Sequence, residues 1–201
     1  MSEKNLTMRS LHDLGLAAWF GGSLMGAVGL NRAGASVADP GQRLPVSSTG
    51  WARWTPVNAA AIGTHLVGAA GELIAETPRM SIQSGVGRTS LVKTGLTAAA
   101  LGVTGYSRML GKKLEKAGEV PAEGTTEPHP QTPDQVASAQ RQLKVLQWAI
   151  PALTGSLVVL TAYMGEQQKP GQVFRGVLGR MSGTSRKAPM LLGMLAARRR
   201  G

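Results

Sequence analysis

The sequence of 201 residues contains no cysteine and few aromatic residues. The absence of cysteine excludes disulfides, thiolate catalysis and cysteine-ligated zinc or iron–sulfur sites. Aromatic residues make up only 4% of the chain, whereas glycine occurs 27 times, so a water-soluble core would be short of large side chains. Small residues of this kind suit the close helix packing of a membrane interior better.

Acidic residues are also scarce, with 11 Asp and Glu against 22 Lys and Arg and a net charge of +11. Such a charge suits an anionic membrane surface, nucleic acid or an acidic partner. The basic residues are not interleaved with aromatic residues that could stack on bases, so nucleic acid is not an expected partner. A soluble basic nucleic-acid-binding protein is kept as a second alternative.

The motifs of common enzymes are missing as well: the sequence has no HExxH, no Walker loop and no GxSxG. Its nine methionines are scattered, and its three histidines are far apart in sequence. We expect His12 and His65 at different depths, which argues against a metal or haem site, and we expect His65 to pack with a hydrogen bond. The sequence therefore predicts no catalytic residue, no cofactor and no metal.

The first apolar stretch, residues 14–30, holds no charge. A helix of this length is at the short end of what crosses about 30 Å of hydrocarbon. Ala18, Gly22 and Gly26 recur every four residues and predict a seam against which another helix packs closely. A cleaved signal peptide is the alternative, but the stretch is longer than usual and Arg32 separates it from any small-residue cleavage site.

Three further apolar stretches complete the predicted architecture, at residues 57–75, 91–110 and 148–165. With the first they predict an all-α integral membrane four-helix bundle over residues 1–165. After Asn31 and Arg32 the chain is expected to form a connection, because Pro40, Gly41, Pro45 and residues 47–50 favour turns, and no span is expected to continue through it. Residues 76–90 are expected to form a short polar link, so that the third helix returns antiparallel beside the second.

A polar stripe runs along the second predicted helix. Asn58, His65 and Glu72 are spaced by seven residues, which places them on one helical face. Antiparallel packing is expected to bring Lys93 to the depth of Glu72, where the two are candidates for an intramembrane ion pair. The alternative is that both lie near the membrane surface and extend their charged ends into water.

Two segments are expected to lie outside the membrane. Residues 117–133 are rich in proline and acids and read as a disordered, flexible loop. Residues 166–201 form a basic tail with eight Lys and Arg against one acid. This tail is expected either to lie on the anionic lipid of the membrane surface or to be a solvated, disordered segment.

The distribution of charge also favours one orientation. With four spans both termini lie on one side, and that side carries 13 of the 22 Lys and Arg residues. The excess predicts cytoplasmic termini for a multi-pass protein of the plasma membrane, although Arg108, Lys112, Lys113 and Lys116 gather on the other side.

The first predicted helix carries a resemblance to known proteins. Residues 12–22, HDLGLAAWFGG, resemble the opening H-x-L-x-x-x-x-W-x-G-G helix of several small bacterial membrane families, including the copper-resistance D type. The alanine- and glycine-rich composition is similar to that of uncharacterised small four-helix actinobacterial membrane proteins. The resemblance implies an integral membrane bundle without a particular activity. The lack of further histidines and of methionine clusters argues against a role with copper.

Two functional hypotheses follow from these patterns. The first is a non-catalytic accessory or interaction subunit that packs through its Gly/Ala seam, as a homo-oligomer or in a larger membrane complex. The second is a small transporter or an ion or proton permeation element that uses the Asn58, His65 and Glu72 stripe.

Overall fold

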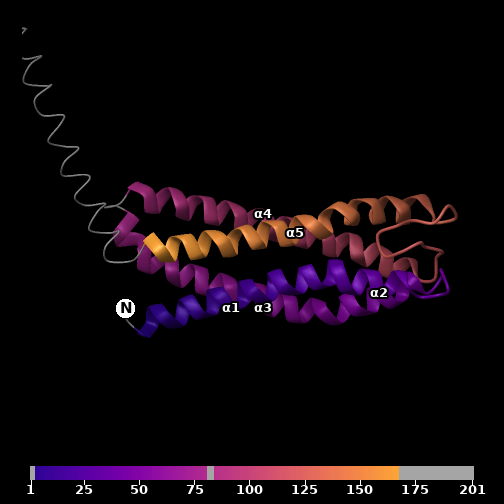
Figure 1. The fold of residues 1–201 in the computed structure, drawn as a ribbon, viewed down its shortest axis with the longest axis horizontal. Coiled ribbons are helices and arrows are strands. Elements are labelled where there is room, and N and C mark those ends of the chain that lie inside the picture. Colours follow the sequence, from indigo (N-terminus) through magenta and orange to yellow (C-terminus); the bar gives the residue numbers. More distant parts are fainter. Residues whose placement is uncertain (1–2, 81–83, 168–201) are drawn as a thin grey trace, which may run out of the picture.

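The computed structural model describes residues 3–80 and 84–167, with side chains for 6–75 and 88–165, and these residues form a bundle of helices (Figure 1). The bundle is built from the helices α1 (Glu3–Met25), α2 (Asn31–Ala35), α3 (Arg43–Met80), α4 (Ser84–Ala117) and α5 (Asp134–Gln167). A π-helical turn, Gly26–Leu30, joins α1 to α2 without a break, so Leu6–Ala35 is one long helix. The prediction of an all-α four-helix architecture is confirmed.

The four long helices run up and down along one axis (Figure 1). α1 packs against α3 and α5, and α4 packs against the same two helices, so each helix has two neighbours. One end of the bundle holds the start of α1 and the close of α5, and the other holds the connections 36–42 and 118–133. We call these the N-terminal end and the loop end.

The helices are longer than the predicted spans. Both connections are shorter than predicted. α2 extends to Ala35 and α3 begins at Arg43, so the first connection is confined to residues 36–42, and the prediction is wrong only for the residues on either side. Pro45 is tolerated in α3 because a proline in the first turn of a helix removes no intrahelical hydrogen bond. The link expected over 76–90 is shorter in the same way, because α3 extends to Met80 and α4 begins at Ser84. The basic tail lies outside the described residues from 168 onward.

The proline-rich loop is packed rather than disordered. Gly118 ends α4 with a φ of 66°, a left-handed conformation that glycine adopts without strain. The loop then folds back on the bundle and buries Ala122, Thr125, Thr126 and Thr132. Composition predicts disorder for this loop because composition takes no account of side chains outside the loop that bind its backbone.

Two side chains of the helices supply those partners. The Arg43 guanidinium donates to the carbonyl oxygens of Ala122 at 3.0 Å and Glu123 at 3.1 Å. The buried Gln140 amide donates to the carbonyl oxygens of Gly124, Thr125 and Glu127 at 2.9–3.3 Å. Below them a small apolar core closes the loop end, formed by Leu44, Leu110, Leu114, Ala122, Val136 and Ala139.

The interior of the bundle contains polar as well as apolar residues, and many apolar residues lie on its outside. Buried polar side chains there include His12, Ser23, Asn31, His65 and Thr154. Exposed side chains include Leu14, Val57, Val67, Ile74, Leu91 and Val159. Among the residues that the structure describes, three helices are long and apolar enough to cross a membrane: Leu6–Ala35, Arg43–Ala75 and Asp134–Gly165. α4, which contains the predicted span 91–110, is not among them.

Candidate functional site

The predicted polar stripe of α3 faces the interior of the bundle. His65 is fully buried, the Glu72 side chain is 17% exposed, and the Asn58 side-chain oxygen is shielded from solvent. These residues lie on one face because seven residues are close to two turns of an α-helix. The interior therefore holds a line of polar groups along the middle part of α3.

Glu72 contacts Lys93 of α4 at the end of the stripe that lies toward the N-terminal end of the bundle. Lys93 Nζ lies 2.6 Å from Glu72 Oε2, and the two side chains are 12% and 17% exposed. The distance is that of a charge-assisted hydrogen bond. The structure thus brings together the two residues that antiparallel geometry paired in the sequence.

His12 joins the stripe, which sequence reasoning did not anticipate. The His12 and His65 rings lie with their centroids 4.4 Å apart, and both side chains are fully buried. The expectation that they occupy different depths is wrong. α1 begins at Glu3, so His12 is already in its third turn and lies level with the middle of α3.

Glycines bring these two helices together. A Cβ atom on Gly15 would collide with the backbone of His65, and one on Gly68 would collide with the backbone of His12. Backbone therefore meets backbone at this crossing, as small residues allow in membrane helices. Each histidine is consequently held beside a glycine of the facing helix.

The hydrogen bonds of the two histidines leave one nitrogen of each ring without a partner. His12 Nδ1 lies 2.8 Å from the Asp13 carboxylate, and His65 Nδ1 lies 3.4 Å from the carbonyl oxygen of His12. Both partners are acceptors, so Nδ1 carries the hydrogen in each neutral ring and Nε2 carries the lone pair. Both Nε2 atoms are buried and have no hydrogen-bond partner among the described residues.

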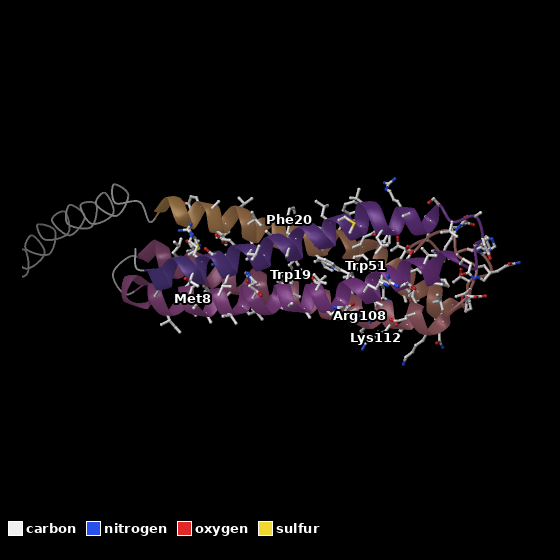
Figure 2. All side chains as sticks on the ribbon, turned by 90° about the horizontal axis from the view of Figure 1, so that it is seen from below. Met8, Trp19, Phe20, Trp51, Arg108 and Lys112 are labelled. Atoms are coloured by element: carbon white, nitrogen blue, oxygen red, sulfur yellow. The ribbon has the colours of Figure 1, made fainter. Side chains whose placement is uncertain are left out.

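Trp19 packs against His65 on the side of the histidine pair that faces the loop end. Its ring is fully buried and lies edge-on to His65, with centroids 6.0 Å apart. Its Nε1–H donates to Thr104 Oγ1 of α4 at 3.2 Å. Figure 2 shows Trp19 near the middle of the bundle, with Met8 toward the N-terminal end and Trp51 and Arg108 toward the loop end.

The predicted seam of α1 is filled from within the chain. A Cβ atom on Gly22 would collide with the Trp54 ring, and one on Gly26 would collide with the Trp51 ring. Ala18, the third residue of the seam, is partly buried one turn earlier. Gly22 and Gly26 pack against tryptophans of α3, so the seam is part of the bundle and not a free surface.

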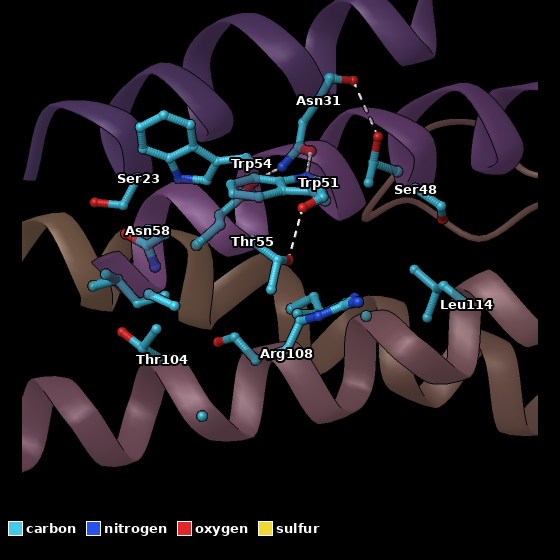
Figure 3. Close-up of a pocket in the computed structure, with 18 of the residues that line it drawn as sticks. Ser23, Asn31, Ser48, Trp51, Trp54, Thr55, Asn58, Thr104, Arg108 and Leu114 are labelled. Carbon is cyan, nitrogen blue, oxygen red and sulfur yellow. Dashed lines mark hydrogen bonds between the residues drawn. The ribbon is translucent and has the colours of Figure 1, made fainter. Parts of the chain in front are cut away.

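Beyond Trp19 lies a cavity of about 360 Å³ near the loop end (Figure 3). Its wall is largely apolar and includes Trp51, Trp54, Ile62, Leu101, Leu143 and Ile150. Within the part of the chain that the structure describes, three buried polar atoms of lining residues have no hydrogen-bond partner: Asn58 Oδ1, Ser107 Oγ and Arg108 Nε. The volume is within the range of about 300–1,000 Å³ typical of small-molecule sites.

One edge of the cavity is held by a hydrogen-bonded chain across three helices. Asn31 of α2 donates to Gln147 Oε1 of α5 at 2.7 Å, and Trp51 Nε1–H of α3 donates to Asn31 Oδ1 at 2.8 Å. Nearby, Ser47 Oγ and Thr125 Oγ1 are 2.6 Å apart and tie the loop to α3. The Trp51 ring is therefore fixed by a polar contact at its indole nitrogen (Figure 3).

Among the described residues, no three or more His, Cys, Asp or Glu side chains gather as metal ligands. The histidine pair is the nearest approach to such a group, and Asp13 and Glu72 are already engaged with His12 and Lys93. Comparison of the chain with models of protein families, with curated proteins and with solved structures finds no match.

Proposed function

We propose that the chain is a multi-pass integral membrane protein of the plasma membrane that crosses the bilayer four times. Three apolar helices and the apolar exterior support this. α4 is less apolar, but it lies between α3 and α5 and pairs Lys93 with Glu72 inside the bundle. A charge held in this way can enter a membrane at far lower cost than an isolated one.

Membrane residence is tested by extraction and labelling. The protein should stay in the membrane fraction in high salt and alkaline carbonate, whereas a soluble nucleic-acid binder would be released. Cysteines replacing Glu3 and Glu119 should react with an impermeant reagent from opposite sides, because these residues lie at opposite ends of the bundle. Labelling of both from one side would refute the four crossings.

The excess of Lys and Arg on the N-terminal side supports cytoplasmic termini, and the basic tail supports contact with anionic lipid. Each basic residue near such a surface contributes about 1 kcal/mol to the attraction. The direction of labelling at Glu3 in sealed cells tests the orientation.

Within the membrane, the buried histidine pair supports the role of a proton permeation element. The observation that carries this is a pair of buried imidazole rings with centroids 4.4 Å apart, each with an Nε2 lone pair that has no partner among the described residues and lies where an unpaired polar atom is costly. Each Nε2 can take up a proton and hold it as a buried imidazolium, and the neighbouring ring offers a second site for that proton. Asp13 is 49% exposed and bonded to His12, so it connects the pair to the surface of the bundle.

Proton flux into vesicles tests this role. Purified protein is reconstituted, a pH gradient is applied with valinomycin and potassium to cancel the membrane potential, and an enclosed pH-sensitive dye reports the flux. We expect His65→Gln and His12→Gln to abolish the flux. Val67→Ala should keep it, because Val67 lies on α3 but faces outward. Wild-type flux equal to that of protein-free vesicles would refute the role and leave the polar interior as packing.

An accessory role remains the other prediction. The seam that suggested it is occupied by Trp51 and Trp54, so a partner would need a different surface. The exposed apolar faces of α3 and α5 offer one in the membrane, either to a second copy or to a larger complex. The two roles are separated by purifying wild type and His65→Gln in mild detergent and comparing the proteins that co-purify with each. In an accessory role the His65→Gln variant should retain the partner that co-purifies with wild type.

A further inference from the structure

The cavity at the loop end has features that the proton path does not explain. It is separated from the histidine pair by the buried ring of Trp19. Its wall is largely apolar, but Asn58 Oδ1, Ser107 Oγ and Arg108 Nε are three buried polar atoms that lack partners in residues 6–75 and 88–165, whose side chains are described. Buried polar groups in native proteins are normally hydrogen-bonded, so an unpaired group marks a place where a water or a ligand belongs.

The two donors among these atoms, on Arg108 and Ser107, define the chemistry of an occupant. Arg108 supplies a cationic N–H donor and Ser107 a hydroxyl donor, and both come from adjacent positions on α4. A carboxylate or another small oxyanion can accept from both. The remaining wall, with Trp51 and Trp54 on one side and Leu101 on the other, suits an apolar chain or ring.

Arg108 is positioned to face inward while remaining charged. Its Nη1 lies 3.2 Å from Glu115 Oε2, at the outer part of the guanidinium, and this leaves Nε directed at the bundle. Figure 3 shows the Arg108 side chain reaching from α4 toward the tryptophans of α3. Glu115 is 44% exposed and therefore binds the solvent side of the arginine rather than the cavity.

We propose that this cavity binds a small amphipathic carboxylate, with its acid group on Arg108 and Ser107 and its apolar body between the tryptophans. The site opens near the level where Trp51 and Trp54 are flanked by the charged loop end, the region in which interfacial tryptophans gather in membrane proteins. A molecule that carries one acid and an apolar body partitions to that depth. The proposal is independent of proton permeation, because no residue of the histidine pair lines the cavity.

Binding can be measured with a probe that quenches tryptophan fluorescence. Bromo-substituted octanoate is titrated into the detergent-solubilised protein, and the brominated alcohol of the same length serves as the neutral probe. We expect saturable quenching by the acid and a much weaker response to the alcohol. Equal, non-saturating quenching by both would show partition into the detergent or onto the apolar surface and would overturn the proposal.

Variants separate a role in binding from a role in folding. Arg108→Gln should weaken the acid by at least about tenfold and leave the alcohol unchanged, since a hydrogen bond to a charged group is lost. Arg53→Gln is the matched control, because Arg53 is exposed on α3 between the two tryptophans and does not line the cavity. Glu115→Gln removes the ion pair of Arg108 but should not weaken the acid.

If Glu115→Gln loses as much affinity as Arg108→Gln, the arginine acts through its ion pair and the proposal fails. A second variant, Asn58→Asp, covers the case in which Arg108→Gln does not fold. It keeps the size of the side chain and places a like charge at the cavity wall, so the acid should bind several-fold more weakly and the alcohol unchanged. Acid binding that is insensitive to Asn58→Asp would contradict a carboxylate in this cavity.

Discussion

The ion pair between Glu72 and Lys93 allows the energetics of the bundle interior to be measured. Lys93 Nζ lies 2.6 Å from Glu72 Oε2, and each side chain is less than a fifth exposed. At an effective dielectric constant of about 20, charges this close attract by on the order of 5 kcal/mol, and desolvation of both groups offsets much of this. Removing one partner leaves the other charge buried, which costs about 3–5 kcal/mol in a fully buried pair.

The partial exposure of this pair lowers the expected cost. We predict that Glu72→Gln lowers the free energy of unfolding by about 2–3 kcal/mol and that Lys93→Met lowers it by a similar amount. The double variant should lose no more than either single variant, because no unpaired charge remains. The coupling energy is then about 2 kcal/mol, well above the roughly 0.5 kcal/mol expected of independent sites.

The assay is unfolding of the detergent-solubilised protein by increasing mole fraction of sodium dodecyl sulfate, followed by far-ultraviolet circular dichroism. Wild type, both single variants and the double variant complete the cycle. Additive losses, with a coupling below about 0.5 kcal/mol, would mean that the two side chains reach water separately near the membrane surface. That result would refute the intramembrane pair and restore the alternative reading of the stripe.

Three further predictions concern the packing of the bundle. Gly68→Ala should destabilise the protein by about 1–3 kcal/mol, because its Cβ would collide with the backbone of α1. Gly63→Ala, with open space around it, should stabilise the protein by up to about 1 kcal/mol. Equal effects of the two variants in thermal unfolding would disprove the close crossing of α1 and α3. Gln140→Leu should speed proteolysis of the loop 118–133 and Gln135→Leu, at an exposed position, should not. Trp19→Phe removes the indole donor and should cost about 1 kcal/mol by chemical unfolding, and an unchanged stability would contradict the hydrogen bond.

The helical face of the stripe could be predicted because it depends on geometry within one helix. A spacing of seven residues places Asn58, His65 and Glu72 on one side whatever the helix packs against. The pairing of Glu72 with Lys93 needed one further assumption, that a short link returns the next helix antiparallel. The link is shorter than predicted, and the pair forms at the same depth.

Helix boundaries were harder to predict because turn-forming residues are not always in turns. Pro45 and Gly50 suggested a connection, yet both lie in the first turns of α3. A Cβ atom on Gly50 would come within 2.6 Å of the Leu30 side chain, so the glycine serves close packing and not a turn. Local propensity cannot report a partner that is 20 residues away in sequence.

The contact between His12 and His65 could not be predicted from the spacing of residues on either helix. It depends on how far α1 extends before His12 and on the register set by Gly15 and Gly68. The two glycines are the feature of the sequence that could have indicated the contact. Each histidine faces a glycine of the other helix, and a buried histidine requires such room. The order of the proline-rich loop likewise depends on Arg43 and Gln140, which lie outside it.

Trp19 is the residue that relates the two candidate sites. Its ring contacts His65 on one side, and its Nε1–H binds Thr104, which lines the cavity, on the other. The ring is fully buried between the two sites, so a proton that entered from the loop end would have to pass Trp19 to reach the histidines. A carboxylate in the cavity would change the surroundings of Thr104, and the indole is the contact through which that change would reach the histidines.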